Sequence, residues 1–118
     1  MLIVYDSMTG NVQRFVDKLN LTTTRLRDEL IVGEPYILVT YTIGFGEVPE
    51  STIKFLESNH KYLLAVASSG NMNWGSNFGK AADKIANKFN VPVLMKFELS
   101  GTSKDIDKFK QEVMIFDN

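Results

Sequence analysis

The chain has 118 residues, of which 44% are hydrophobic and 23% are charged, and its formal net charge is −1. We expect residues 1–118 to form one domain, because a chain of this length supports a single hydrophobic core. The near-zero charge lacks the basic excess typical of nucleic-acid-binding proteins. The absence of cysteine excludes disulfides, thiol chemistry and thiolate metal sites, and a single histidine argues against a histidine metal site.

The beginning of the chain shows no targeting signal. Residues 1–6 lack the basic region and the long apolar run of a signal peptide. No stretch approaches the roughly 20 apolar residues of a membrane span. We therefore expect a cytoplasmic protein with no membrane partner, no nucleic-acid partner and no metal site of its own.

Five short segments, most of them apolar and bounded by polar loops, predict strands. Continuous apolar runs of this kind are typical of strands that are buried on both faces of a parallel sheet. The second segment is polar and carries the weakest pattern. The predicted strands cover residues 2–5, 23–26, 36–40, 63–67 and 92–99.

Helices are predicted between these strands. Val12, Phe15, Val16 and Leu19 recur at the spacing of one helical face. A second helix begins near Pro49, which suits a first helical turn, and ends near residue 59. Two more amphipathic stripes cover residues 78–89 and 106–116, and the second follows a capping box at residues 102–105.

Alternation of strands and helices indicates a parallel sheet with helices on both faces. The sequence thus predicts an α/β protein: a flavodoxin-like three-layer α/β/α sandwich whose five-stranded parallel sheet has the order 2-1-3-4-5. In such sheets ligands bind at the carboxyl ends of the strands. Three loops rich in Gly, Ser, Thr and Asn fall at that edge, at residues 7–11, 41–48 and 68–75.

The first of these loops has the features of a phosphate site. Hydroxyls and free backbone N–H groups at the start of a helix attract an anion. The loop contains no lysine or arginine, so we expect neutral donors alone to hold the phosphate. A plain helix N-cap would also account for this loop by itself.

The other two loops suit the walls of a planar ligand. Gly44 and Gly46 flank Phe45, and glycine permits backbone orientations that other residues avoid. Trp74 is the single tryptophan and lies on a polar loop, where it either covers the core or stacks on a ligand. A phosphate cradle between two such walls fits a flat phosphorylated cofactor, and FMN is the natural candidate.

Four blocks of the sequence resemble the NrdI family, small flavodoxin-like proteins of class Ib ribonucleotide reductase systems. They read DSMTGNVQRF at residues 6–15, TYTIGFGEVP at 40–49, ASSGNMNWG at 67–75 and KFELSGT at 96–102. The resemblance spans nearly the whole chain. Two positions depart from the pattern. Val12 stands where flavodoxins usually have Thr or Ser, and Met72 stands where the family often has Arg or Lys.

The resemblance implies a function. Such proteins bind FMN without a covalent bond, and the reduced flavin reacts with O₂. The oxidant, superoxide, passes to the dimanganese centre of NrdF, the small subunit of the reductase, and enables its tyrosyl radical to form. A flavin or thiol reductase would supply the electrons. The chain would then be an activating electron carrier rather than a stand-alone metabolic enzyme, with no catalytic side chain of its own.

The resemblance also implies the residues that hold the cofactor. One group would bind the phosphate, a second would border the ring and its reactive N5 atom, and a third would close the opposite side. Residues 98–101 would be structural or part of the rim. In that order, the three groups are Ser7, Met8, Thr9, Gly10, Asn11 and Val12; Tyr41, Thr42, Gly44, Phe45 and Gly46; and Ser69, Gly70, Asn71, Asn73, Trp74, Gly75 and Phe78.

Two other functions share the predicted fold. A general electron-transfer flavodoxin would use the same FMN site to serve unrelated reductases. A receiver-type signalling module shares the strand order, but it needs an acidic phosphoacceptor at the end of the third strand. Here that strand ends in Val39, Thr40 and Tyr41.

Overall fold

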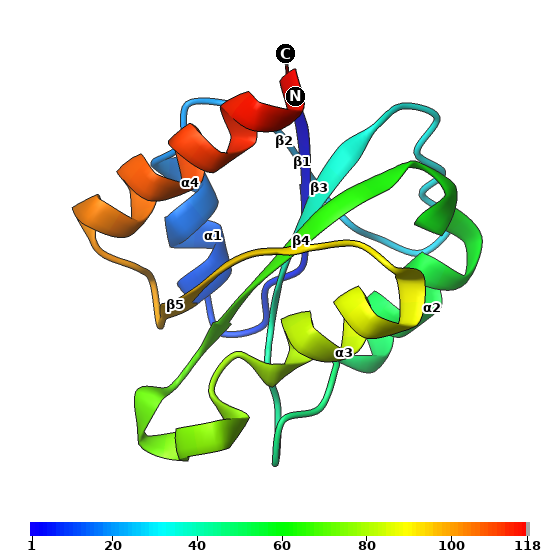
Figure 1. Cartoon of the computed structure of the whole chain (residues 1–118). Helices are drawn as coiled ribbons and strands as arrows, with labels where there is room; N and C mark the ends of the chain where they lie inside the picture. The colour runs from blue at the N-terminus through cyan, green and yellow to red at the C-terminus, as the bar shows by residue number, and fades with distance from the viewer. Residues whose placement is uncertain (118) are drawn as a thin grey trace.

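The computed structural model describes residues 1–117 and contains one five-stranded sheet in the order β2-β1-β3-β4-β5 (Figure 1). Every neighbouring pair of strands is parallel, so the predicted sheet and its order are confirmed. The carboxyl ends of the strands therefore share one edge, at the bottom of Figure 1. The strands are β1 (Leu2–Tyr5), β2 (Thr22–Arg25), β3 (Tyr36–Tyr41), β4 (Leu63–Gly70) and β5 (Val93–Glu98).

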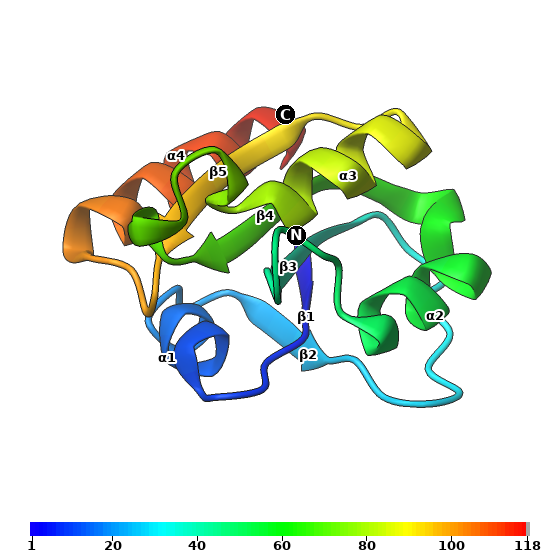
Figure 2. The ribbon, with the colours of Figure 1, turned by 90° about the horizontal axis from the view of Figure 1, so that it is seen from below.

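Helices cover both faces of the sheet, as predicted (Figure 2). On one face lie α1 (Asn11–Asp17) and α4 (Ser103–Asp117), and on the other lie α2 (Glu50–Asn59) and α3 (Lys80–Phe89). Two 3-10 turns, η1 (His60–Tyr62) and η2 (Met72–Asn77), flank β4. Within residues 1–117, no helix is long and apolar enough to cross a membrane.

A cluster of three aromatic rings packs the first helix against the last strand and the last helix. The Phe15 ring of α1 stacks on the Phe97 ring of β5, with 3.8 Å between ring centroids, and meets the Phe109 ring of α4 edge-on at 5.3 Å. Gly101 follows β5 with φ +74°, and a Cβ there would lie 2.7 Å from Phe15 Cδ1. Only glycine therefore lets the loop after β5 pass this close to the ring.

The sequence prediction was wrong about where β4 ends. It placed the strand at residues 63–67 and began a loop at residue 68, whereas β4 continues to Gly70. Ser68 and Ser69 are buried, and their hydroxyls donate to the carbonyl oxygens of Gly79 (2.8 Å) and Leu99 (2.6 Å). Because each hydroxyl has a partner, these polar residues are accommodated in a buried strand.

Smaller differences lie at other boundaries. β2 begins and ends one residue earlier than predicted, and α1 stops at Asp17 while Leu19 is still buried. Pro49 precedes α2 rather than lying in its first turn. The capping box before α4 is confirmed: the Thr102 N–H donates to Asp105 Oδ2 (2.8 Å), and the Asp105 N–H donates to Thr102 Oγ1 (3.2 Å).

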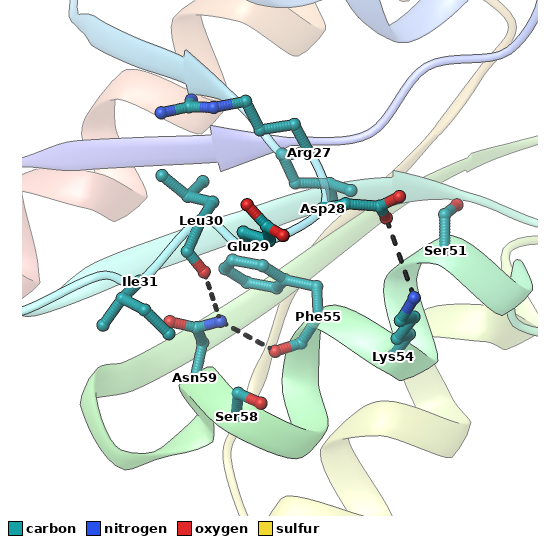
Figure 3. A pocket seen from close by; sticks show the side chains of 11 residues that line it. Arg27, Asp28, Glu29, Leu30, Ile31, Ser51, Lys54, Phe55, Ser58 and Asn59 are labelled. Atoms are coloured by element: carbon teal, nitrogen blue, oxygen red, sulfur yellow. Dashed lines mark hydrogen bonds and ion pairs between the residues drawn. The ribbon is translucent and has the colours of Figure 1, made fainter.

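Asn59, at the end of α2, holds the long connection between β2 and β3 (Figure 3). Its Oδ1 accepts from the Val32 N–H (2.7 Å), and its Nδ2 donates to the carbonyl oxygens of Leu30 (2.9 Å) and Phe55 (3.0 Å). A cavity of about 100 Å³ remains between the connection and α2. The amide thus replaces the backbone partners that an irregular segment lacks.

Replacing Asn59 with alanine should lower the free energy of unfolding by about 1–3 kcal/mol, because the buried Val32 N–H loses its acceptor. Urea unfolding measures this loss, and protease cleavage near residues 27–34 should become faster. Asn87→Ala, on the exposed side of α3, is the matched control and should change stability by less than about 0.5 kcal/mol. Equal effects of the two substitutions would contradict the role of Asn59.

Tyr36 makes the stability depend on alkaline pH. It is fully buried, its hydroxyl donates to the Asn59 carbonyl oxygen (2.6 Å), and burial raises its pKa above the ordinary value. Above about pH 10 the unfolded chain loses a phenol proton that the folded chain keeps, so stability should fall as the pH rises. Tyr36→Phe should be less stable at neutral pH and should show a shallower alkaline decline in urea unfolding. An unchanged alkaline slope would contradict this assignment.

Candidate functional site

A cavity of about 190 Å³ opens at the carboxyl ends of β1, β3 and β4. All three predicted loops contribute to its lining, and every lining residue except Leu99 was predicted from the sequence. Leu99 comes from the loop after β5, which was assigned to the rim. The lining residues are Ser7, Met8, Thr9, Asn11, Val12, Tyr41, Thr42, Ser69, Gly70, Asn71, Trp74 and Leu99.

Some predicted residues lie outside the cavity lining. Residues 43–47 form a closed turn, in which the Ile43 and Glu47 backbones pair in both directions, and Phe45 is 87% exposed at its tip. Phe78 lines a neighbouring hollow beside β5. The cofactor roles of this group, like those of the residues that line the cavity, stay predictions. The group comprises Gly10, Gly44, Phe45, Gly46, Asn73, Gly75 and Phe78.

The loop after β1, which contributes five residues to the cavity lining, carries unpaired backbone donors. Among the hydrogen bonds of residues 1–117, none uses a backbone N–H of residues 7–12 as its donor. Pairing resumes at Gln13, whose N–H donates to Ser7 Oγ (3.2 Å), and at Arg14, whose N–H donates to the Gly10 carbonyl oxygen (2.9 Å). A run of successive free N–H groups forms a concave site suited to an anion.

Two arginines flank this loop, so positive charge lies near it although the loop itself has none. Arg25 Nη2 donates to the Ser7 carbonyl oxygen, and Arg14 Nη2 donates to Asn11 Oδ1 (2.7 Å). Both cations lie outside the loop, one on β2 and one on α1, so inspection of the loop sequence missed them. The parallel pairing of β1 with β2 places Arg25 beside Tyr5, just before the loop, and this register could have indicated that Arg25 lies near the loop.

Trp74 is a wall of the cavity and no part of the core. It is 40% exposed and belongs to neither buried apolar cluster. The η2 turn fixes its backbone: the Trp74 N–H donates to the Asn71 carbonyl oxygen (3.0 Å), while Asn71 Oδ1 accepts from the Asn73 N–H (2.9 Å). The partly exposed indole face is thus available for stacking.

Tyr41 forms the second aromatic wall and keeps its proton at neutral pH. Burial and then the negative charge of Asp6 raise the pKa of the Tyr41 phenol above its usual range. Asp6 is itself buried, and it accepts hydrogen bonds from Ser51 Oγ (2.5 Å) and Thr52 Oγ1 (2.8 Å). The wall therefore carries a neutral phenol that can donate a hydrogen bond.

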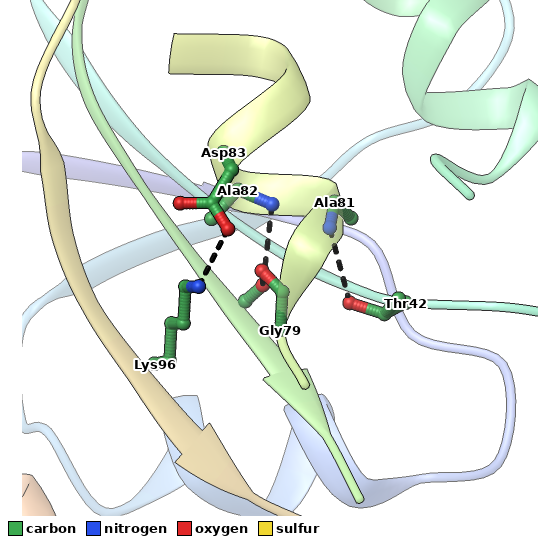
Figure 4. Close-up of polar contacts among 7 residues, drawn as sticks. Thr42, Gly79, Ala81, Ala82, Asp83 and Lys96 are labelled. Atoms are coloured by element: carbon green, nitrogen blue, oxygen red, sulfur yellow. Dashed lines mark hydrogen bonds and ion pairs between the residues drawn. The ribbon is translucent and has the colours of Figure 1, made fainter. Parts of the chain in front are cut away.

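Hydroxyls at the ends of the strands fix α3 beside the cavity (Figure 4). The Ala81 N–H donates to Thr42 Oγ1 (3.4 Å), and the Ala82 N–H donates to Ser68 Oγ (3.3 Å). Farther along, Lys96 Nζ of β5 pairs with Asp83 Oδ2 of α3 at 2.5 Å. These contacts hold the helix against the edge of the sheet that carries the cavity.

Solved structures that resemble this chain are flavodoxins. Flavodoxin 1 from Bacillus cereus has a TM-score of 0.73 and 19% identity, with 99% of this chain and 97% of that chain covered. A Streptococcus pneumonia TIGR4 flavodoxin has a TM-score of 0.71 and 26% identity, with 96% and 94% covered. A Fusobacterium nucleatum flavodoxin bound to flavin mononucleotide has a TM-score of 0.63 and 14% identity, with 98% and 95% covered. The likeness to these structures shows the fold.

Sequence comparison gives the family. A family model described as NrdI Flavodoxin like matches residues 3–111. A Protein NrdI from Bacillus licheniformis is 57% identical over 112 residues, which cover 94% of this chain and 86% of the relative. A Protein NrdI from Macrococcus caseolyticus is 51% identical over 114 residues, covering 96% and 88%. The chain therefore belongs to the NrdI family of flavodoxin-like proteins, which are FMN-binding redox proteins.

Proposed function

We propose that this chain holds FMN in the cavity and supplies superoxide to the dimanganese centre of NrdF, so that the tyrosyl radical of class Ib ribonucleotide reductase can form. The observation that carries the proposal is the row of free N–H groups at residues 7–12, set between the aromatic walls Tyr41 and Trp74 in a chain of this family. In this role the chain is an activating protein for a partner enzyme.

The donor set fits the phosphate of FMN. The backbone N–H groups of residues 7–12 and the hydroxyls of Ser7 and Thr9 are neutral donors, and the guanidinium groups of Arg14 and Arg25 add positive charge nearby. Charge-assisted hydrogen bonds of this kind favour a dianion over a neutral group.

The size of the cavity fits a ring that is only partly enclosed. Small-molecule sites commonly measure about 300–1,000 Å³, so a cavity of about 190 Å³ encloses part of a flat cofactor and leaves an edge in solvent. Trp74 and Tyr41 would lie against the ring. The protonated Tyr41 phenol would offer a hydrogen-bond donor to it.

FMN bound here would supply the redox chemistry, the one-electron reduction of O₂ to superoxide, once a flavin or thiol reductase had reduced it. The protein would orient the cofactor through residues 7–12 and would leave one edge of the ring accessible to O₂ and to a partner. Oxidant leaving at this edge would enter the manganese site of a docked NrdF.

Exposed apolar side chains support docking at the same edge. Met8 is 66% exposed, Met72 63% and Leu99 49%, and all three lie on loops around the cavity, together with Phe45 and Trp74. Clustered exposed apolar side chains mark interaction surfaces. We propose that NrdF covers this group of side chains when it receives the oxidant.

The proposal predicts that the chain activates manganese-loaded NrdF only when FMN, a reductant and O₂ are all present. Tyrosyl radical should appear by electron paramagnetic resonance in the complete mixture and should be absent when any one component is omitted. Added superoxide dismutase should lower the yield if the oxidant passes through solvent, and leave it unchanged if transfer occurs within the complex. Reduced FMN that binds and oxidises normally without yielding radical would instead favour a general electron-transfer flavodoxin.

Substitution of Trp74 should weaken FMN binding. Loss of aromatic stacking in Trp74→Leu should raise the Kd about 2- to 13-fold, equivalent to about 0.5–1.5 kcal/mol. In the unsubstituted protein FMN should quench the fluorescence of this single tryptophan, and flavin fluorescence gives the Kd of the variant. Ser76→Ala, on the same turn but outside the cavity lining, is the control and should bind FMN normally. Failure of FMN to quench Trp74 would count against the site.

A further inference from the structure

We propose that Arg14 and Ser100 act as positioning residues that make the site prefer FMN over riboflavin, by fixing the orientation of the Asn11 side-chain amide. The inference rests on the proposed function, in which residues 7–12 receive the cofactor's phosphate. Neither Arg14 nor Ser100 lines the cavity. Asn11 does line it, so Ser100 would affect the phosphate through Asn11, and Arg14 would do so in addition to the positive charge that it adds nearby.

Three side chains from two distant parts of the chain form a closed set of hydrogen bonds. Asn11 Oδ1 accepts from Arg14 Nη2 (2.7 Å) and from Ser100 Oγ (2.8 Å). Arg14 Nε in turn donates to Ser100 Oγ (2.9 Å). Each member contacts the other two, so none can turn without breaking two hydrogen bonds.

This set fixes which end of the amide faces the phosphate loop. An amide oxygen has two acceptor sites, and both are used on Asn11. The Nδ2 group therefore lies on the other side, 3.4 Å from Thr9 Oγ1, to which it donates. The Thr9 hydroxyl accepts there, so its own hydrogen is free to donate elsewhere. The loop would thus offer the Thr9 hydroxyl as a donor to an anion.

Backbone features on both sides leave room for this arrangement. Gly10 has φ +91°, and a Cβ there would lie 2.8 Å from Arg14 Nη1, so a glycine lets the guanidinium lie flat against the loop. Ser100 lies between Leu99 and Gly101, whose N–H groups donate to the carbonyl oxygens of Gly70 (3.0 Å) and Glu98 (2.9 Å). Ser100 thus has a fixed position that does not depend on Asn11.

If Arg14, Asn11 and Ser100 only held α1 to the loop after β5, substitutions among them would affect flavin binding differently. In that case loss of the contact would loosen the site as a whole, and any flavin would bind less well. Control of the phosphate donors affects FMN alone, because riboflavin has the same ring and no phosphate. The ratio of the two dissociation constants separates these roles.

The test is titration of the unsubstituted protein and of Arg14→Gln and Ser100→Ala with FMN and with riboflavin, followed by flavin fluorescence. We expect the FMN Kd to rise about tenfold in each variant, a change of about 1.4 kcal/mol, while the riboflavin Kd stays within about twofold. Arg27→Gln, an exposed arginine on the β2–β3 connection, is the matched control and should leave both values unchanged.

Asn11→Asp gives a second test, in which the acceptor for Arg14 and Ser100 is kept and only the donor to Thr9 is lost. A carboxylate can still accept from Arg14 and Ser100, but it places a negatively charged oxygen where the amide donated. We expect an FMN Kd at least about tenfold above that of Arg14→Gln, again with riboflavin binding retained.

Parallel losses of both flavins, or no change with either, would overturn the inference while leaving FMN binding by the unsubstituted protein intact. An unsubstituted protein that binds FMN no more tightly than riboflavin would also overturn it. An unsubstituted protein that binds neither flavin would overturn the proposed function, and this inference with it.

Discussion

Parallel pairing of β1, β3 and β4 is the constraint on which the site depends. Tyr5 pairs with Val39 and Tyr41 pairs with Ser69, so the three strands end within a few residues of one another at the same edge. Helices cover both faces of the sheet, which leaves this edge as the place where loops of different strands meet. The loop after β1, Tyr41 and Trp74 thereby line one cavity although they are far apart in the sequence.

The site uses hydrogen-bonding groups that also hold the fold together. Ser68 and Ser69 extend β4 only because their hydroxyls reach carbonyl groups of neighbouring segments, and Thr42 accepts from the start of α3. These interactions fix the edge of the cavity before any ligand binds. A site that is already ordered loses less conformational entropy when a ligand binds.

Sequence patterns were enough for the strand order, the layers and the three loops that meet at the cavity, because periodicity and loop position follow from local residue types. The resemblance to the NrdI family supplied the individual residues of the lining. Contacts between distant segments could not be read in this way. Arg25 reaches Ser7 through strand pairing, Ser100 reaches Asn11 across the molecule, and Leu99 enters the cavity from a loop assigned to the rim. Each depends on tertiary geometry that no local window contains.

Gly101 links the packing of the protein interior to the edge of the sheet that carries the cavity. The Phe15 ring occupies the space that a side chain at position 101 would need, and Ser100 immediately precedes this glycine. A change in the size or tilt of that ring would displace the loop and with it the serine hydroxyl. Packing around Phe15 and the position of the Ser100 hydroxyl beside Asn11 are therefore physically coupled through Gly101.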